Sequence, residues 1–225
     1  MTGRRPRERR RPWSPRSAAT AAAGALAAAN LSRPLVPGGV WHVATTAALI
    51  GIGGRAGLGA AELGLGRDRV RAGLRLGGLA FVGISAVVVA GGLLGVVTDD
   101  RAEVGGGEVA LRVLVVIPLG TVLVEELAFR GVLHGLLHRA AAPAVATAVG
   151  SLAFGLWHVV PTATGGGVQT GDVALPLLVA GTFLATTAAG FGFEWLRRRS
   201  DSLLAPALAH LATNSITFTV AWALG

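Results

Sequence analysis

Stretches of roughly 20 apolar residues, the length that an α-helix needs to cross a bilayer core, recur along the whole chain. One or two such stretches could be buried helices of a soluble protein, but a chain made of them could not. The sequence therefore predicts an all-α, polytopic membrane helix bundle with about seven transmembrane helices. The predicted spans are about Ser17–Leu31, Val40–Ala60, Leu76–Val97, a span that starts near Val109, Pro143–Val160, Val173–Leu196 and Ser202–Leu224.

The composition supports this fold class and excludes others. Only 14% of the 225 residues are charged, whereas soluble domains carry about 25%, and the long uncharged stretches exclude a disordered chain. Glycine occurs 34 times, which suits close helix packing inside a bilayer. The sequence contains no cysteine, which excludes disulfides, thiolate catalysis and cysteine-ligated zinc or iron–sulfur sites.

Positive charge is concentrated at the N-terminus and predicts an orientation. All 20 basic residues are arginines, and seven of them lie within residues 1–16. We interpret this segment as a cytoplasmic tail and not as a nucleic-acid-binding segment, because it has one aromatic residue and no fold. A cytoplasmic N-terminus puts 17 of the 20 arginines inside and the acidic loop Thr98–Glu108 outside. The first span also has features of a signal peptide, and we favour an uncleaved anchor.

Three polar clusters inside the apolar stretches are the candidates for function, because ionisable groups are costly in a bilayer. They are Glu125 and Glu126 with Arg130, then His158, and finally His210 with Asn214. The structural alternatives are an intrahelical ion pair between Glu126 and Arg130, a core histidine bonded to a backbone carbonyl, and a hydrogen bond between helices. That ion pair would not account for Glu125. The two glutamates point about 100° apart on a helix, so we expect them to have different roles.

The three clusters can meet if one helix is long. A tilted helix from Val109 to about Arg139 would place Glu125 roughly 21 Å from its cytoplasmic end. On the same measure His158 lies at roughly 22 Å, and His210 and Asn214 at roughly 14 and 20 Å. At a shared depth, Glu125 is a plausible general base. The histidines and Asn214 could then hold a water molecule, a metal ion or a developing oxyanion.

A further histidine pair, His134 and His138, has the i, i+4 spacing of residues on one helix face. The pair lacks the intervening glutamate of a zinc-protease helix. We interpret both residues as interfacial, without a metal role.

The clusters, in this order, resemble the motifs of the CPBP family of intramembrane proteases. This family contains the CAAX prenyl endopeptidases and the bacterial Abi and bacteriocin-immunity proteins. Its motifs are a glutamate pair followed by arginine, then Phe-x-x-x-His, then His-x-x-x-Asn. Here they read EELAFR at Glu125–Arg130, FGLWH at Phe154–His158 and HLATN at His210–Asn214. Each motif alone is weak, whereas the ordered set is fairly specific.

The resemblance implies a role for each motif residue. Glu125 would activate a water molecule, His158 and His210 would bind that water or a metal, and Asn214 would assist. Glu126 and Arg130 would support the site. Glu125, His158 and His210 make a plausible zinc set with an open position, and the sequence leaves both a metal-bound and a metal-free site open.

The resemblance covers about residues 109–218 and suggests a division of the chain. We expect an Arg-rich cytoplasmic tail (1–16), N-terminal transmembrane helices (17–108) and a CPBP-like catalytic transmembrane core (109–225). The Ala-, Gly- and Arg-rich composition without lysine suggests a bacterial plasma membrane protein, so the prenylated eukaryotic substrate is not carried over with the motifs.

The predicted function is an intramembrane endopeptidase, in the manner of a metalloprotease, that cleaves a membrane-associated peptide or protein by a Glu-activated water. Its partners would be the lipid bilayer and that substrate, with no nucleic acid. The alternative is a non-enzymatic membrane scaffold or immunity protein that retains the fold. A transporter or channel is disfavoured because the sequence contains no persuasive internal repeat.

Overall fold

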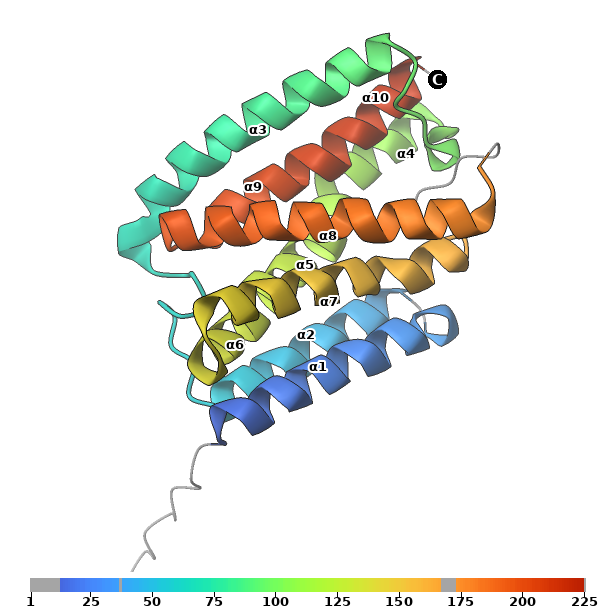
Figure 1. Cartoon of the computed structure of the whole chain (residues 1–225). Coiled ribbons are helices and arrows are strands. Elements are labelled where there is room, and N and C mark those ends of the chain that lie inside the picture. Colours follow the sequence, from blue (N-terminus) through green and yellow to red (C-terminus); the bar gives the residue numbers. More distant parts are fainter. Residues whose placement is uncertain (1–12, 37, 167–172, 225) are drawn as a thin grey trace, which may run out of the picture.

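The computed structural model describes residues 13–36, 38–166 and 173–224, and every regular element in these ranges is helical. The predicted all-α fold is therefore confirmed, and the long helices run side by side as a bundle (Figure 1). The α-helices are α1 Pro15–Ser32, α2 Gly38–Arg55, α3 Val70–Leu93, α4 Gly106–Leu111, α5 Leu123–Glu126, α6 His134–Ala140, α7 Pro143–Ala163, α8 Leu175–Ser200, α9 Leu204–Leu211 and α10 Thr217–Leu224. Short 3₁₀ turns cover Arg33–Leu35, Arg67–Arg69 and Asp100–Ala102.

Four of these helical segments are long and apolar enough to cross a membrane. They are Arg67–Leu93, Gly106–Ala140, Pro143–Ala163 and Leu175–Ser200. Large apolar side chains on them, such as Leu79, Leu114 and Leu184, are about two-thirds exposed or more. Surfaces of this kind suit lipid contact, and the protein is an integral membrane protein.

The other three predicted spans are also helical, but they do not reach the same hydropathy, so the number seven stays a prediction. The first two correspond to α1 and α2. The third is a continuous helix made of α9, a π-helical turn Ala212–Ile216 and α10. Polar groups reduce the apolar character of these helices: α2 carries His42 and Arg55, and the last helix carries His210 and Asn214.

Two predicted boundaries are corrected by the structure. α2 ends at Arg55 and not near Ala60, because Gly57 adopts a left-handed backbone with φ of 70°. There the N–H of Leu58 donates to the carbonyl of Gly53, and the N–H of Gly57 donates to that of Gly54, a glycine-capped helix end. α3 begins at Val70, earlier than the predicted Leu76, because the residues before the apolar stretch, which include Arg71 and Arg75, are also helical.

The predicted long helix around the glutamate pair is present as one helical segment, Gly106–Ala140. It contains α4, α5 and α6, joined by wider π-helical stretches at Arg112–Val122 and Leu127–Leu133. Pro118 lies in the first of these stretches and cannot donate a backbone hydrogen bond. The N–H of Leu123 donates to its carbonyl, five residues back. The glutamate pair therefore lies between two π-helical stretches, a feature that is frequent at functional sites.

Small residues bring α7 and α8 together at the level of the polar clusters. A Cβ atom on Gly155 of α7 would overlap the Thr187 hydroxyl of α8. Gly190 of α8 packs on Ser151 of α7, where an added Cβ would lie 3.1 Å from the Ser151 Cα. Glycine permits this close backbone approach, which holds the histidine face of α7 against α8.

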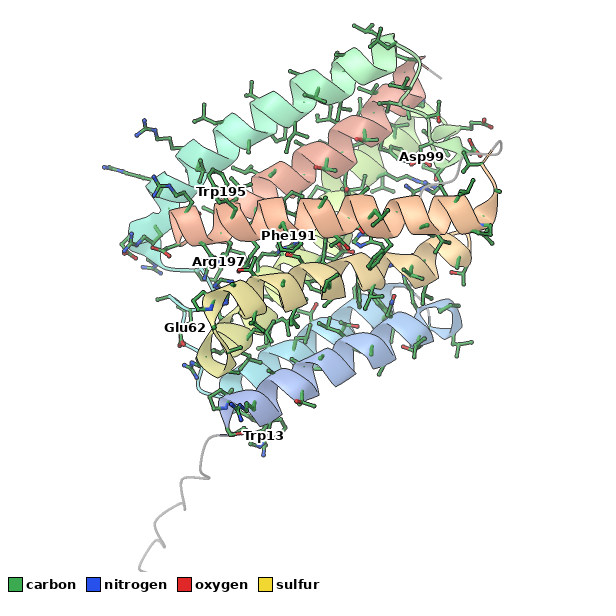
Figure 2. The ribbon with its side chains drawn as sticks, viewed as in Figure 1. Trp13, Glu62, Asp99, Phe191, Trp195 and Arg197 are labelled. Atoms are coloured by element: carbon green, nitrogen blue, oxygen red, sulfur yellow. The ribbon has the colours of Figure 1, made fainter. Side chains whose placement is uncertain are left out.

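Charged groups gather at the two ends of the bundle. Arg197 of α8 and Glu62 lie at one end, and Asp99 lies at the other (Figure 2). At the first end, Arg139 donates to Glu62 and to the carbonyls of Ala56 and Gly57. This is the end that the arginine bias predicts to be cytoplasmic, while residues 1–12 of the predicted tail lie outside the described residues.

Candidate functional site

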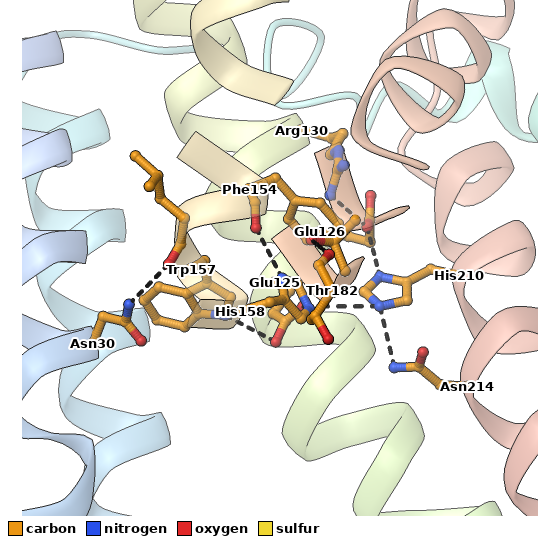
Figure 3. A network of polar contacts seen from close by, with 12 residues as sticks. Asn30, Glu125, Glu126, Arg130, Phe154, Trp157, His158, Thr182, His210 and Asn214 are labelled. Carbon is orange, nitrogen blue, oxygen red and sulfur yellow. Dashed lines mark hydrogen bonds and ion pairs between the residues drawn. The ribbon is translucent and has the colours of Figure 1, made fainter. Parts of the chain in front are cut away.

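The structure brings the three predicted clusters together around the carboxylate of Glu125 (Figure 3). Glu125 comes from α5, His158 from α7, and His210 and Asn214 from the last helix. The Glu125 Oε2 atom lies 3.8 Å from His158 Nε2 and 3.8 Å from His210 Nε2. Residues separated by up to 89 positions in the sequence thus share one site, as the common-depth argument predicts.

The two oxygens of Glu125 have different environments. Oε1 accepts a hydrogen bond of 2.9 Å from the Trp157 indole N–H. Oε2 is buried and has no hydrogen-bond partner among the described residues. Oε2 lies 3.8 Å from each of the two imidazole Nε2 atoms. Burying a carboxylate oxygen without a partner is costly, so this oxygen is available to accept a hydrogen bond.

Hydrogen bonds on the far side of each ring assign the imidazole tautomers. His158 Nδ1–H donates to the Phe154 carbonyl at 2.8 Å. His210 Nδ1–H donates to Glu126 Oε1 at 2.8 Å. A carbonyl or carboxylate oxygen can only accept, so in the neutral rings both Nε2 atoms carry a lone pair. The backbone bond of the structural alternative for His158 is therefore present, and the same bond orients the ring toward Glu125.

Glu126 contacts a different set of groups from Glu125. Arg130 Nη1 donates to Glu126 Oε1 at 3.0 Å, and both side chains are almost fully buried. The predicted intrahelical ion pair is therefore present. The same oxygen also accepts from His210. The Arg130 guanidinium lies 4.0 Å from the centroid of the Phe154 ring, which places this cation on an aromatic face.

Asn214 completes the group. Its Nδ2 donates to His210 Nε2 at 3.2 Å. A carboxamide nitrogen has two N–H groups, so the second N–H is available to another acceptor. All six predicted site residues are thus in one hydrogen-bonded or ion-paired set.

Sequence reasoning missed two aromatic residues of this site. Trp157 supplies the only hydrogen bond that Glu125 accepts among the described residues. Phe193 of α8 stacks on the His210 ring, with centroids 5.1 Å apart and planes at 25°. Trp157 could have been found as the neighbour of His158 in its motif. Phe193 lies outside the three motifs, so the sequence pattern carried no signal for it.

The predicted metal set has the chemistry to hold a zinc ion. Two imidazole Nε2 lone pairs and an unpartnered carboxylate oxygen converge, and each imidazole N–H is fixed by an outer oxygen, as is usual for metal-ligating histidines. Glu125, His158 and His210 would be the ligands. The bond from Asn214 to His210 Nε2 would have to give way, because it uses the same lone pair.

A second group of possible metal ligands lies nearby on α6 and α8. The ligand atoms of His134, His138 and Glu194 all lie within 4.8 Å of one another. This group could hold a metal ion, in contrast to the interfacial role predicted for the two histidines. The sequence gave no reason to join Glu194 to them, since it comes from α8, far along the chain.

Comparison with known proteins identifies the segment that contains the site. Residues 107–216 match the family model "Type II CAAX prenyl endopeptidase Rce1-like". This segment belongs to the CPBP/CAAX protease family. The match agrees with the predicted extent of about 109–218, and it includes the six predicted site residues. No curated protein and no solved structure matches the chain.

Proposed function

We propose that the chain is an intramembrane endopeptidase that cleaves a membrane-associated peptide or protein with a water molecule activated by Glu125. The observation that carries the proposal is the buried Oε2 of Glu125, which lacks a hydrogen-bond partner and faces two imidazole lone pairs. The CAAX protease match is to a protease family and supports the same conclusion.

The proposed reaction begins with a water molecule between Glu125 and the two imidazoles. One O–H of the water points to Glu125 Oε2, and the other points to a Nε2 lone pair. Glu125 takes the first proton as the water oxygen attacks the peptide carbonyl carbon. The hydrogen bond from Trp157 holds the carboxylate in this orientation.

The charge that develops on the carbonyl oxygen needs a donor. The free N–H of Asn214 is the group proposed for this role, because preorganised donors stabilise the oxyanion of a tetrahedral intermediate. Collapse of the intermediate breaks the C–N bond, and Glu125 returns its proton to the leaving amine. Glu126 and Arg130 keep His210 in the required tautomer and orientation.

A zinc ion bound by Glu125, His158 and His210 would supply Lewis-acid activation at the same place. The donor set described above supports this assignment. The roles proposed for Trp157, Glu126 and Arg130 are the same with or without the ion, since they orient its ligands.

We further propose a bacterial plasma membrane location with a cytoplasmic N-terminus. The arginines that the topology assigns to the inside include Arg139 and Arg197, which lie together with Glu62 at one end of the bundle. The acidic loop with Asp99 lies at the opposite end. The positive-inside rule then favours the arginine-containing end as cytoplasmic.

The test does not require knowledge of the substrate. Wild type and Glu125→Gln are expressed at matched levels, and new peptide termini across the membrane proteome are compared by mass spectrometry. Gln keeps an oxygen for Trp157 but cannot take a proton from water. We expect some cleavages to occur with wild type and not with Glu125→Gln. The control Glu108→Gln should retain them, because Glu108 is an exposed acid outside the proposed site.

The same experiment distinguishes the enzyme from a scaffold. Lost function with normal abundance and folding of Glu125→Gln supports catalysis. Retained cleavage in Glu125→Gln would exclude the proposed role of Glu125, and lost function that follows lost folding would favour a scaffold.

A further inference from the structure

The inner-end cluster, which we define as His134, His138 and Glu194, lies outside the proposed catalytic group. Both histidines come from α6, and Glu194 comes from α8. His134 Nδ1 lies 2.7 Å from Glu194 Oε1, and His138 Nε2 lies 3.7 Å from the same oxygen. Two imidazoles and one carboxylate thus converge on one point from two helices.

His138 is already oriented as a metal ligand. Its Nδ1–H donates to the His134 carbonyl at 3.0 Å, so Nε2 carries the lone pair of the neutral ring. That Nε2 atom is buried and has no hydrogen-bond partner among the described residues. A buried acceptor without a partner is unfavourable, and a cation shared with Glu194 would satisfy it.

Access and charge also suit a cation. A cavity of about 500 Å³ opens beside the histidines, which leaves room for water at the remaining coordination positions. Its lining contains three arginines and three acids, namely Arg69, Arg139, Arg197, Glu62, Asp68 and Asp201. Arg139 is paired with Glu62, and Arg69 is paired with Asp68 and Asp201. Arg197 donates to two backbone carbonyls. The lining thus carries equal numbers of arginines and acids, and the buried Glu194 adds one further carboxylate beside His134.

We propose that the inner-end cluster is a second metal site, separate from Glu125, that binds Zn²⁺ and joins the long helix to α8. Imidazole nitrogen and carboxylate oxygen are ligands that Zn²⁺ accepts, and three protein ligands plus water is an established coordination for it. Glu194 follows Phe193, which stacks on His210. Zinc binding would therefore also immobilise the aromatic contact of the catalytic group. The site stands whether or not Glu125 is catalytic.

The first experiment measures Zn²⁺ binding to the purified, metal-free, full-length protein in detergent by competition with a chromophoric chelator. To isolate the new site, it uses a His158→Ala background, which removes one ligand of the predicted catalytic set. We expect Zn²⁺ to bind this protein and raise its Tm. His138→Ala and Glu194→Gln are each expected to weaken binding at least about tenfold, whereas His42→Ala, a histidine elsewhere in the bundle, leaves binding unchanged.

A second measurement needs no ligand variant and remains informative if these variants do not fold. Cu²⁺ with ascorbate and oxygen oxidises histidines that bind the ion, and peptide mass spectrometry locates the modified rings. In wild type we expect oxidation of His134 or His138, suppressed by excess Zn²⁺. No Zn²⁺ binding in the His158→Ala background, or oxidation confined to His158 and His210, would overturn the proposal.

Discussion

Two histidine–glutamate groups, each with at least one member on the long helix, differ in how they are held. In the proposed catalytic group, which comprises Glu125, Glu126, Arg130, His158, His210 and Asn214, Glu125 lies between imidazoles that are oriented by Phe154 and Glu126. In the inner-end cluster, the carboxylate contacts His134 directly at 2.7 Å, and a cavity opens beside it. The first group thus has a carboxylate oxygen available for water, while the second has a buried nitrogen available for a cation.

This difference shows that residue type alone does not determine the chemistry of a polar cluster. Each group contains two histidines and at least one glutamate. Among the described residues, the unpartnered atoms nevertheless differ: Glu125 Oε2 is among those of the first group, and His138 Nε2 is the one in the second. A free carboxylate oxygen suits proton abstraction, whereas a free imidazole lone pair beside a carboxylate suits metal ligation.

The largest expected effect is the loss of cleavage in Glu125→Gln. Removing a general base lowers kcat/KM by about 10²–10⁴-fold, measured on a substrate identified from the proteome comparison. If the two groups are distinct, Glu194→Gln should weaken Zn²⁺ binding far more than it slows cleavage. A larger loss of cleavage in Glu194→Gln than in Glu125→Gln would reverse the two assignments.

The next effect concerns the buried ion pair between Glu126 and Arg130 in the proposed catalytic group. Arg130→Ala leaves Glu126 charged and buried, and we expect a loss of about 3–5 kcal/mol in the free energy of unfolding, measured in detergent. Arg198→Ala is the matched control, because Arg198 is exposed and bonds only Thr147 among the described residues. The double variant Glu126→Gln, Arg130→Met should be more stable than Arg130→Ala. Equal stability of wild type and Arg130→Ala would contradict this account of the pair.

Asn214→Ala tests whether the catalytic group contains an oxyanion donor. Removal of one such donor typically lowers kcat by about 10²–10³-fold, and we expect KM to change little. Thr213→Ala is the control from the same helix, because the Thr213 hydroxyl donates only to the Ala209 carbonyl. A rise in KM with unchanged kcat would instead make Asn214 a substrate-binding residue.

A smaller effect is expected where α7 meets α8. Gly155→Ala introduces a methyl group against Thr187 and the Phe183 carbonyl, and overpacking of this kind costs about 1–3 kcal/mol. It should also slow cleavage, because His158 lies one turn further along the same helix. Gly181→Ala in α8 meets no atom within 4 Å and should be neutral or stabilising, since alanine favours helix. Equal behaviour of the two variants would show that the α7–α8 contact does not position His158.

Much of the catalytic group could be predicted because its signals are local in sequence. Glu125, His158 and His210 are ionisable residues within apolar stretches, and the rise per residue of a helix gives their relative depth. The ion pair between Glu126 and Arg130 follows from their i, i+4 spacing. The long helix was predictable from the same depth argument, although its π-helical stretches were not.

The inner-end cluster could not be predicted for an equally physical reason. Its third member, Glu194, lies in a helix whose sequence is separated from His134 by all of α7. Nothing in the sequence shows which face of α8 meets α6. The number of membrane spans does not follow from helix length alone, because α1 consists largely of alanine and α2 carries His42 and Arg55.

The smallest expected effect is a pH dependence confined to the rim of the cavity beside the inner-end cluster, where Glu62 and Arg139 meet. The hydrogen bond from Arg139 holds the pKa of Glu62 below its usual value. The ionised form is therefore favoured in the folded state, and this stability is present above the unfolded pKa of about 4.3 and is lost as pH falls through the folded pKa. Both side chains of the pair are about one-third exposed, so the pair should contribute about 0.2–1 kcal/mol. Glu62→Gln should accordingly unfold at a lower temperature than wild type at pH 7, with the difference shrinking below about pH 4. A difference that grows on acidification would place the stabilising charge elsewhere on the rim.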